Sequence, residues 1–228
     1  PDFDPHHTSC GGYGYWWPRD AVYIAAALDE AGYHEPAANF YYFAKSVQDR
    51  DGSWHQRYFT DGSVAPFWGR QIDQAGSVLW GYKHHYNVTG DDRFLQDIWP
   101  SLAAGADYLS NSIQANGLPT VSIDPWEDTY SQGTYSAAAV SAGLMAASDI
   151  AGVCGKKETS RQWLASSAKV KEGILKHQWS DRRSSFVRGV NHMIQDNSRN
   201  AELDGRGKVY TTKDHTGLYQ HHWAEKDA

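Results

Sequence analysis

The stretch GGYGYWWPRDAVYIAAALDEAG, from Gly11 to Gly32, joins a loop rich in glycine and aromatic residues to a segment that predicts a helix. From Asp20 onward this segment is apolar on nearly every side, which is typical of a helix that is buried all round. The segment that follows, Pro36 to Gln48, has one apolar stripe at helical spacing, formed by Phe40, Phe43, Ala44 and Val47. We therefore expect an inner helix followed by an outer one.

The same alternation of a buried segment and a one-sided segment occurs twice more. The two further pairs are Gln71 to Val88 with Asp91 to Ala115, and Thr134 to Ala151 with Glu158 to Gln178. Pro100 predicts a kink or a restart in the second outer helix. Beyond Asp181, only the run FVRGV has the pattern of a short strand. The pattern predicts an all-α fold, a ring of helical hairpins with inner helices around a core and outer helices facing water.

Composition narrows the classes of partner. The 228 residues carry 21 Lys and Arg against 27 Asp and Glu, with no basic run that would neutralise a row of phosphates, so we expect no nucleic-acid partner. No window approaches the roughly 20 consecutive apolar residues of a membrane span, and we expect no membrane partner.

The two cysteines, Cys10 and Cys154, are too few for a disulfide framework and are expected to be buried free thiols. They do not decide the cellular compartment of the protein. Ten Trp and fourteen Tyr supply flat aromatic platforms that suit sugars.

Three loops that lead into the predicted inner helices share one chemistry, an indole beside carboxylates. Their candidate binding residues are Trp17, Arg19 and Asp20 in the first loop, Trp68 and Asp73 in the second, and Asp124, Trp126, Glu127 and Asp128 in the third. If the inner helices run parallel around a ring, the three clusters converge on one mouth. Indole stacks on the apolar face of a pyranose while Arg and Asp bind its hydroxyls, so the recurrence indicates a saccharide pocket.

Each of these residues also has a purely structural interpretation. Asp20 and Asp73 stand at helix starts, where a carboxylate complements the helix dipole. Trp17 and Trp68 fit core packing, and Arg19 fits a surface ion pair. The binding interpretation rests on three similar clusters at equivalent positions.

Glu127 is the candidate catalytic acid. It lies between acidic neighbours and beside Trp126, surroundings that favour the protonated form of a carboxyl group. Glycosidic bond cleavage needs such an acid to protonate the leaving oxygen. The alternative is that the run WED only caps the helix that follows.

Three pairs of adjacent histidines do not have the spacing of a metal site: His6–His7, His84–His85 and His221–His222. They are expected at the surface or in loops, so no metal is predicted.

Four motifs in order make the chain resemble glycoside hydrolase family 15, the glucoamylase and glucodextranase family, in its bacterial and archaeal form. They are GYGYWWPRDAVYIAAALDEAGY, DGSWHQRYFTDG with WGRQIDQAGSVLWG, HYNVTGDDRFLQDIWPSLAAGADYL, and IDPWEDTYSQGTYSAAAV. The resemblance implies an (α/α)6 barrel of six inner and six outer helices. It also implies an exo-acting enzyme that releases β-glucose from non-reducing ends by inversion and needs no cofactor.

The same resemblance implies roles for individual residues. Trp17, Arg19 and Asp20 would hold the terminal glucose, Trp68 would be the platform beside the acid, and Glu127 would be the general acid. Asp124 and Asp128 match the acidic neighbours of that acid. An inverting enzyme also needs a second carboxylate, roughly 6.5 to 9.5 Å from the acid, to activate water.

The family places that general base far downstream of the acid, and this chain ends before it. We therefore expect residues 1–228 to form about half of a barrel, without the base, and Glu225 does not match the base motif. A half-ring leaves the apolar flanks of its inner helices open, which predicts self-association. The alternatives are a trehalase of the same architecture, a non-catalytic helical-repeat protein, and a half-barrel that binds carbohydrate without turnover.

Overall fold

The computed structural model of the chain describes residues 14–65, 69–127, 129–195, 209–213 and 219–223, with side chains through residue 192. Its described part contains six helices. They are α1 (Pro18–Glu30), α2 (His34–Ser46), α3 (Asp73–Thr89), α4 (Asp92–Asn111), α5 (Thr134–Val153) and α6 (Lys157–His177). These match the six predicted segments.

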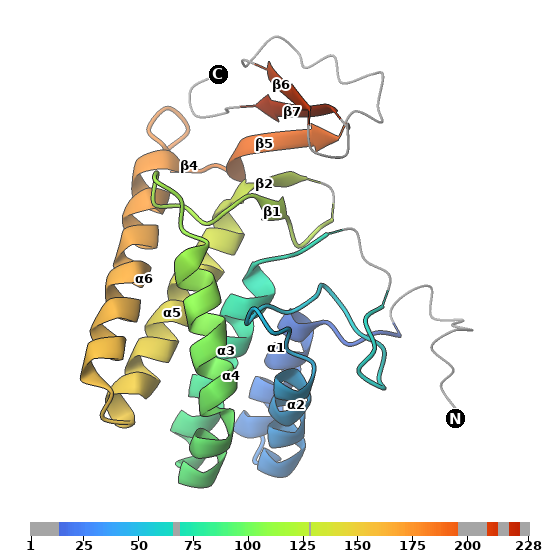
Figure 1. The fold of residues 1–228 in the computed structure, drawn as a ribbon, viewed down its shortest axis with the longest axis vertical. Helices are drawn as coiled ribbons and strands as arrows, with labels where there is room; N and C mark the ends of the chain where they lie inside the picture. Colours follow the sequence, from blue (N-terminus) through green and yellow to red (C-terminus); the bar gives the residue numbers. More distant parts are fainter. Residues whose placement is uncertain (1–13, 66–68, 128, 196–208, 214–218, 224–228) are drawn as a thin grey trace.

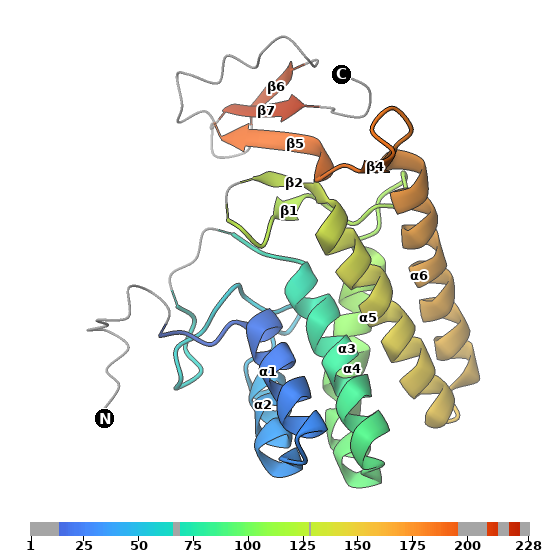
Figure 2. The ribbon, with the colours of Figure 1, turned by 180° about the vertical axis from the view of Figure 1, so that it is seen from behind.

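The helices form two layers (Figures 1 and 2). One layer holds α1, α3 and α5 side by side, and α2, α4 and α6 cover it from the other side, each packed on the helix that precedes it in the chain. The turns are short because local signals end and restart the helices. Gly90 ends α3 with a left-handed φ of 64°, and the Asp91 carboxylate then accepts hydrogen bonds from the first free N–H groups of α4. The expected alternation of inner and outer helices is confirmed.

α4 runs through Pro100 without a break, whereas the sequence predicted a kink or a restart. Both Pro100 and Gln96, whose carbonyl loses its helical partner, are exposed. Water can reach the free carbonyl there, which lowers the penalty of proline inside a helix.

The inner helices α3 and α5 approach each other through small residues. A Cβ atom on Gly76 would stand 2.3 Å from the carbonyl oxygen of Ala139, and one on Gly143 would stand 2.6 Å from the carbonyl oxygen of Gly76. Both positions therefore require glycine if the two backbones are to keep this spacing. We call this contact the glycine seam.

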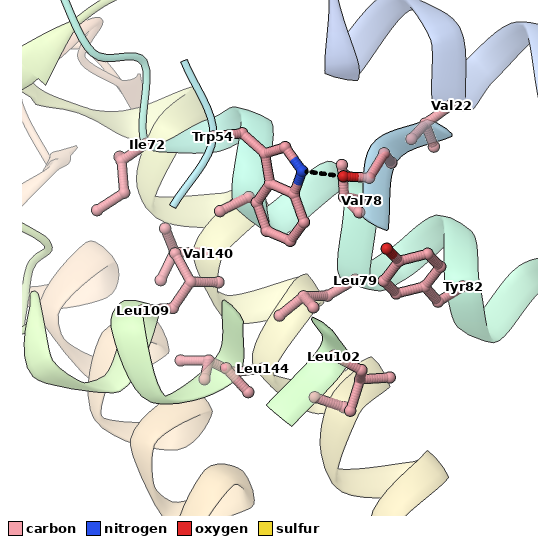
Figure 3. Close-up of a cluster of buried hydrophobic side chains, with 14 of the residues drawn as sticks. Val22, Trp54, Ile72, Val78, Leu79, Tyr82, Leu102, Leu109, Val140 and Leu144 are labelled. Atoms are coloured by element: carbon pink, nitrogen blue, oxygen red, sulfur yellow. Dashed lines mark hydrogen bonds between the residues drawn. The ribbon is translucent and has the colours of Figure 1, made fainter. Parts of the chain in front are cut away.

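The main core lies between the two layers, centred on α3 (Figure 3). Trp54, from the segment between α2 and α3, is its largest fully buried side chain, and its indole N–H donates to the carbonyl of Ala44 at 2.8 Å. Around it pack Val22, Ile72, Val78, Leu79, Tyr82, Leu102, Leu109, Val140 and Leu144.

A sheet lies at the end of the layers where the inner helices begin (Figures 1 and 2). Its antiparallel strands follow the order β1-β2-β5-β7-β6, with bounds β1 (Ser122–Ile123), β2 (Tyr130–Gly133), β5 (Gly189–Gln195), β6 (Val209–Lys213) and β7 (Tyr219–Trp223). A smaller pair joins β3 (Trp179–Ser180) to β4 (Ser185–Phe186). The sequence analysis expected one short strand in FVRGV and otherwise a loop, and this was wrong. Three strands, β1, β3 and β4, span two residues each, too few for an alternating pattern, and the longer strands form by pairing with other segments.

Side chains of α1, α3 and α5 contact one another on the face of the inner layer that α2, α4 and α6 do not cover. Tyr23 of α1 contacts Trp80 of α3, with ring centroids 6.2 Å apart, and Lys83 of α3 pairs with Asp149 of α5. Tyr23, Ile24 and Met145 are exposed large apolar side chains of these helices. Self-association stays a prediction, which sedimentation velocity over a range of concentrations would test.

Two smaller expectations were wrong. Cys154 is exposed at the end of α5, and Cys10 lies outside the described residues. His85 is buried, and its Nδ1 lies 2.9 Å from each carboxylate oxygen of Asp29. Adjacent residues on a helix point to different faces, so the two members of the pair His84–His85 have different surroundings.

Among the described helices, α5 is long and apolar enough, by length and composition, to cross a membrane. Its main contacts are with α3 and α6, which suits a core helix.

Candidate active site

The three segments that enter α1, α3 and α5 meet at the same end of the inner layer (Figure 2). Nη1 of Arg19, in the first turn of α1, donates to Asp73 Oδ2 at 2.8 Å and to Gln71 Oε1 at 3.0 Å. Nε2 of Gln71 in turn donates to the backbone carbonyl of Asp124 at 2.9 Å. A continuous set of hydrogen bonds, which we call the rim network, thus joins the first, second and third loops.

Arg19 and Asp73 form a buried ion pair within the rim network. Their side chains are 13% and 0% exposed. Burial raises the pKa of Asp73, and the neighbouring Arg19 guanidinium opposes that rise. The other oxygen of Asp73, Oδ1, accepts no hydrogen bond from the described residues. Asp73 is therefore placed behind Arg19, where it orients the guanidinium.

Gln74 holds the backbone of the same arginine. The backbone N–H of Arg19 donates to Gln74 Oε1 at 2.6 Å, and Nε2 of Gln74 donates to Gln71 Oε1 at 2.8 Å. Both glutamines are fully buried polar side chains. Arg19 is thus held through its main chain and its side chain, which leaves it little freedom to change direction.

The first loop also supplies exposed groups. The Asp20 side chain is 60% exposed and lies 3.4 Å from Nη2 of Arg19. Trp17, at the start of α1, is half-buried and meets Tyr15 edge to face, with ring centroids 5.6 Å apart. The guanidinium of Arg57 lies over both rings, 4.8 Å from the Tyr15 centroid and 5.6 Å from that of Trp17. This side offers a carboxylate and an aromatic ring to a ligand.

Glu127 stands in the loop between β1 and β2. Its N–H donates to the carbonyl of Asp124 at 3.0 Å, which closes a tight turn, and its φ is 62°, in the left-handed region. That conformation is uncommon for a residue with a side chain and is found where surrounding contacts impose it. The preceding residue, Trp126, is 66% exposed.

The carboxylate of Asp124 is paired inside the same loop. Thr129 Oγ1 donates to Asp124 Oδ2 at 2.9 Å, and Nη2 of Arg188 donates to the same oxygen. The sequence analysis placed Glu127 between acidic neighbours and beside the ring of Trp126. In the structure Arg188 pairs with Asp124, and the indole of Trp126 is open to solvent.

Besides Gln74, sequence reasoning missed two residues of this site. The hydroxyl of Tyr135, in the first turn of α5, lies 3.4 Å from that of Tyr23 on α1, and its ring meets Trp126 at 6.4 Å. Burial, the contact with Tyr23 and the charge of Asp73 raise the pKa of Tyr135. Arg188 is the other. The sequence feature that could have indicated Arg188 is its place inside the apolar run FVRGV, because a cation among apolar residues needs a partner.

Two predicted site residues, Trp68 and Asp128, lie outside the described residues. Within the described ranges, no group of three or more His, Cys, Asp or Glu side chains is arranged to hold a metal ion.

Comparison with known sequences gives a family match over most of the chain. The model of glycosyl hydrolases family 15 matches residues 5–208. An uncharacterized glycosyl hydrolase of Methanocaldococcus jannaschii is 31% identical over 179 residues, which cover 78% of this chain and 28% of that protein. An endo-(1,4)-3-O-methyl-α-D-mannosidase of Mycolicibacterium hassiacum is 32% identical over 109 residues, covering 48% of this chain and 28% of its own length. The chain thus spans just over a quarter of the length of either relative.

Comparison with solved structures addresses the fold. A bacterial glucoamylase in complex with acarbose superposes with a TM-score of 0.66 over 92% of this chain and 29% of that one, at 19% identity. The chain therefore has part of the (α/α)6 barrel fold, as the resemblance to the family implied.

Proposed function

Because the chain belongs to the glycosyl hydrolases of family 15, we propose that it carries the acid half of an exo-acting, inverting α-glucoside hydrolase. In this proposal the enzyme releases β-glucose from the non-reducing ends of α-1,4- or α-1,6-linked glucans or oligosaccharides. The observation that carries it is the rim network, which ties the loop of Glu127 to the guanidinium of Arg19 through Gln71. The loop of Glu127 and the guanidinium of Arg19 are thereby held at one end of the inner helices, which supports a shared role in acid catalysis and sugar binding.

Each side chain has a defined task in the proposed reaction. Glu127 donates a proton to the glycosidic oxygen as the bond to the anomeric carbon breaks. Arg19 and Asp20 bind hydroxyl groups of the terminal sugar, and Trp17 and Trp126 present aromatic rings to its apolar face. Asp73 and Gln74 orient Arg19, and Asp124 closes the turn that carries Glu127.

Inversion also requires a carboxylate that activates water on the opposite face of the sugar, roughly 6.5 to 9.5 Å from the acid. We propose that residues 1–228 are part of a catalytic domain and that this base comes from another part of the barrel. The length of the relatives, of which this chain covers 28%, supports that organisation.

The experiment that tests the proposal is proton NMR of the polypeptide that carries this sequence, incubated with maltose, isomaltose, trehalose and an α-1,4-mannobioside in turn. We expect β-glucose to appear first from maltose or isomaltose. Removing the acid in Glu127→Gln is expected to slow turnover by about 10²- to 10⁴-fold, the usual contribution of general acid catalysis. Glu158→Gln is the matched control, since Glu158 is an exposed carboxylate on α6, away from the rim network.

Each other outcome contradicts a defined part of the proposal. Release of α-glucose first would exclude inversion, and undiminished activity of Glu127→Gln would remove Glu127 from the reaction. Cleavage of trehalose alone would indicate the trehalase alternative. Cleavage of the mannobioside alone would indicate a specificity like that named for the Mycolicibacterium relative. A folded protein that cleaves none of the four would overturn the glucosidase assignment.

A further inference from the structure

The backbone of Arg188 is held by the start of α5 and lies next to a strand of the sheet. It directly precedes β5, which pairs with β2 in the register Gly133 to Gly189. The N–H of Thr134, the first residue of α5, donates to the carbonyl of Arg188 at 2.9 Å, and Thr134 Oγ1 donates to the carbonyl of Val187 at 2.6 Å. The backbone of Arg188 is therefore attached to the start of an inner helix.

From this anchor the side chain reaches the loop that carries Glu127, more than sixty residues earlier in the chain. Nη2 donates to Asp124 Oδ2, and the guanidinium carbon lies 5.3 Å from the ring centroid of Trp126. The Asp124 side chain is 4% exposed, whereas that of Arg188 is 43% exposed. One side chain thus contacts both the first residue of the tight turn and the residue that precedes Glu127.

The turn needs such support. A side chain in the left-handed region is disfavoured by roughly 1–2 kcal/mol, so Glu127 keeps its φ of 62° only while the surroundings impose it. The carbonyl of Asp124 accepts from both the Glu127 N–H at 3.0 Å and Gln71 Nε2 at 2.9 Å. This fixes the main chain of Asp124, while Arg188 and Thr129 hold its carboxylate.

We propose that Arg188 is a positioning residue for the general acid, holding Asp124 and Trp126 so that the turn aims the Glu127 carboxyl at the glycosidic oxygen. This inference rests on the proposed function. It assigns Arg188 to one step, transfer of the proton from Glu127 to the leaving oxygen. Arg19 is held by Gln71, Asp73 and Gln74 and lies beside Asp20, so in this proposal binding of the terminal sugar through Arg19 and Asp20 does not depend on Arg188.

The test uses two substrates that differ in their need for the acid. The first is the disaccharide that the enzyme cleaves, and the second is the glycosyl fluoride of the same sugar, whose fluoride leaves without protonation of an oxygen. Arg188→Met is expected to lower kcat on the disaccharide on the order of 10²-fold, since small misplacements of a catalytic group have effects of that size. On the fluoride we expect less than about a threefold change.

Three further variants complete the design. Arg188→Lys keeps the charge and is expected to recover part of the disaccharide activity. Asp124→Asn, which weakens the other half of the pair, is expected to show the same substrate-selective loss even if Arg188→Met folds poorly. Arg161→Met is the matched control, because Arg161 is an exposed arginine of α6 whose ion pair is with Glu158.

The outcomes separate the two proposals. Equal losses on both substrates in Arg188→Met and Asp124→Asn, or no loss on either, would overturn the positioning role of Arg188. Glu127→Gln serves as the reference, since loss of the acid itself must spare the fluoride. If Glu127→Gln cleaves the disaccharide at the wild-type rate, the proposed function fails first, and the role of Arg188 falls with it.

Discussion

The glycine seam and the rim network each hold α3 to a neighbouring inner helix, but by different means: the seam joins α3 to α5, and the ion pair of the rim joins α3 to α1. Gly76 and Asp73 are only three residues apart on α3, yet one contact is backbone against backbone and the other is a buried ion pair. The seam requires only the absence of a side chain. The rim requires particular donors and acceptors in particular directions. Packing and site geometry are therefore specified separately along one helix, and substitutions at Arg19, Gly76 and Asp73 would show how far that separation holds.

The largest change in the free energy of unfolding is expected at the ion pair between Arg19 and Asp73 in the rim network. Arg19→Met leaves the buried carboxylate of Asp73 without its partner, and removing one member of a buried pair destabilises by about 3 kcal/mol. Urea unfolding measures the change in the free energy of unfolding. Asp20→Asn is the control, because Asp20 is 60% exposed and is expected to change stability by less than about 0.5 kcal/mol. Equal stability of the two variants would show that the rim network serves the site alone.

The second effect concerns the seam. Gly76→Ala places a methyl group 2.3 Å from the Ala139 carbonyl oxygen, so the helices must separate, at about 2 kcal/mol. Gly152→Ala is the same substitution in α5, where the nearest atom is 3.8 Å away, and it is expected to stabilise by up to about 1 kcal/mol. Thermal unfolding of both variants measures the contrast. If both substitutions stabilise the protein, the close approach of α3 and α5 is not required.

The smallest effect is the pH dependence of the rim. Burial raises the pKa of folded Asp73 above the unfolded value of about 3.9, so the folded state binds this proton more tightly than the unfolded state does. Stability from this group is present below the unfolded pKa and is lost as the pH rises through the folded pKa. Compared with Asp73→Asn, which does not titrate, the wild type should gain stability on acidification through that window. The unfolding free energies of both proteins, measured from pH 7 to pH 4, test this. A relative loss on acidification would mean that the Arg19 charge outweighs burial.

Helix periodicity and local motifs predicted the six helices, their alternation and the family. Each depends on residues close together in the chain, where apolar spacing and turn residues act directly. The same reasoning failed for the sheet, since a strand such as β1 spans only Ser122–Ile123 and exists because β2 pairs with it. It failed for His85 as well, because the partner, Asp29, is 56 residues away.

The candidate site divides in the same way. The sequence alone determined which loops carry indole and carboxylate groups, because a helix start and its preceding loop are local features. Only the tertiary structure decided that Asp73 lies behind Arg19, that Gln71 connects the second loop to the third, and that Arg188 balances Asp124. The physical reason is that charge pairing and hydrogen bonding act over a few ångströms in space, whatever the separation of the partners along the chain.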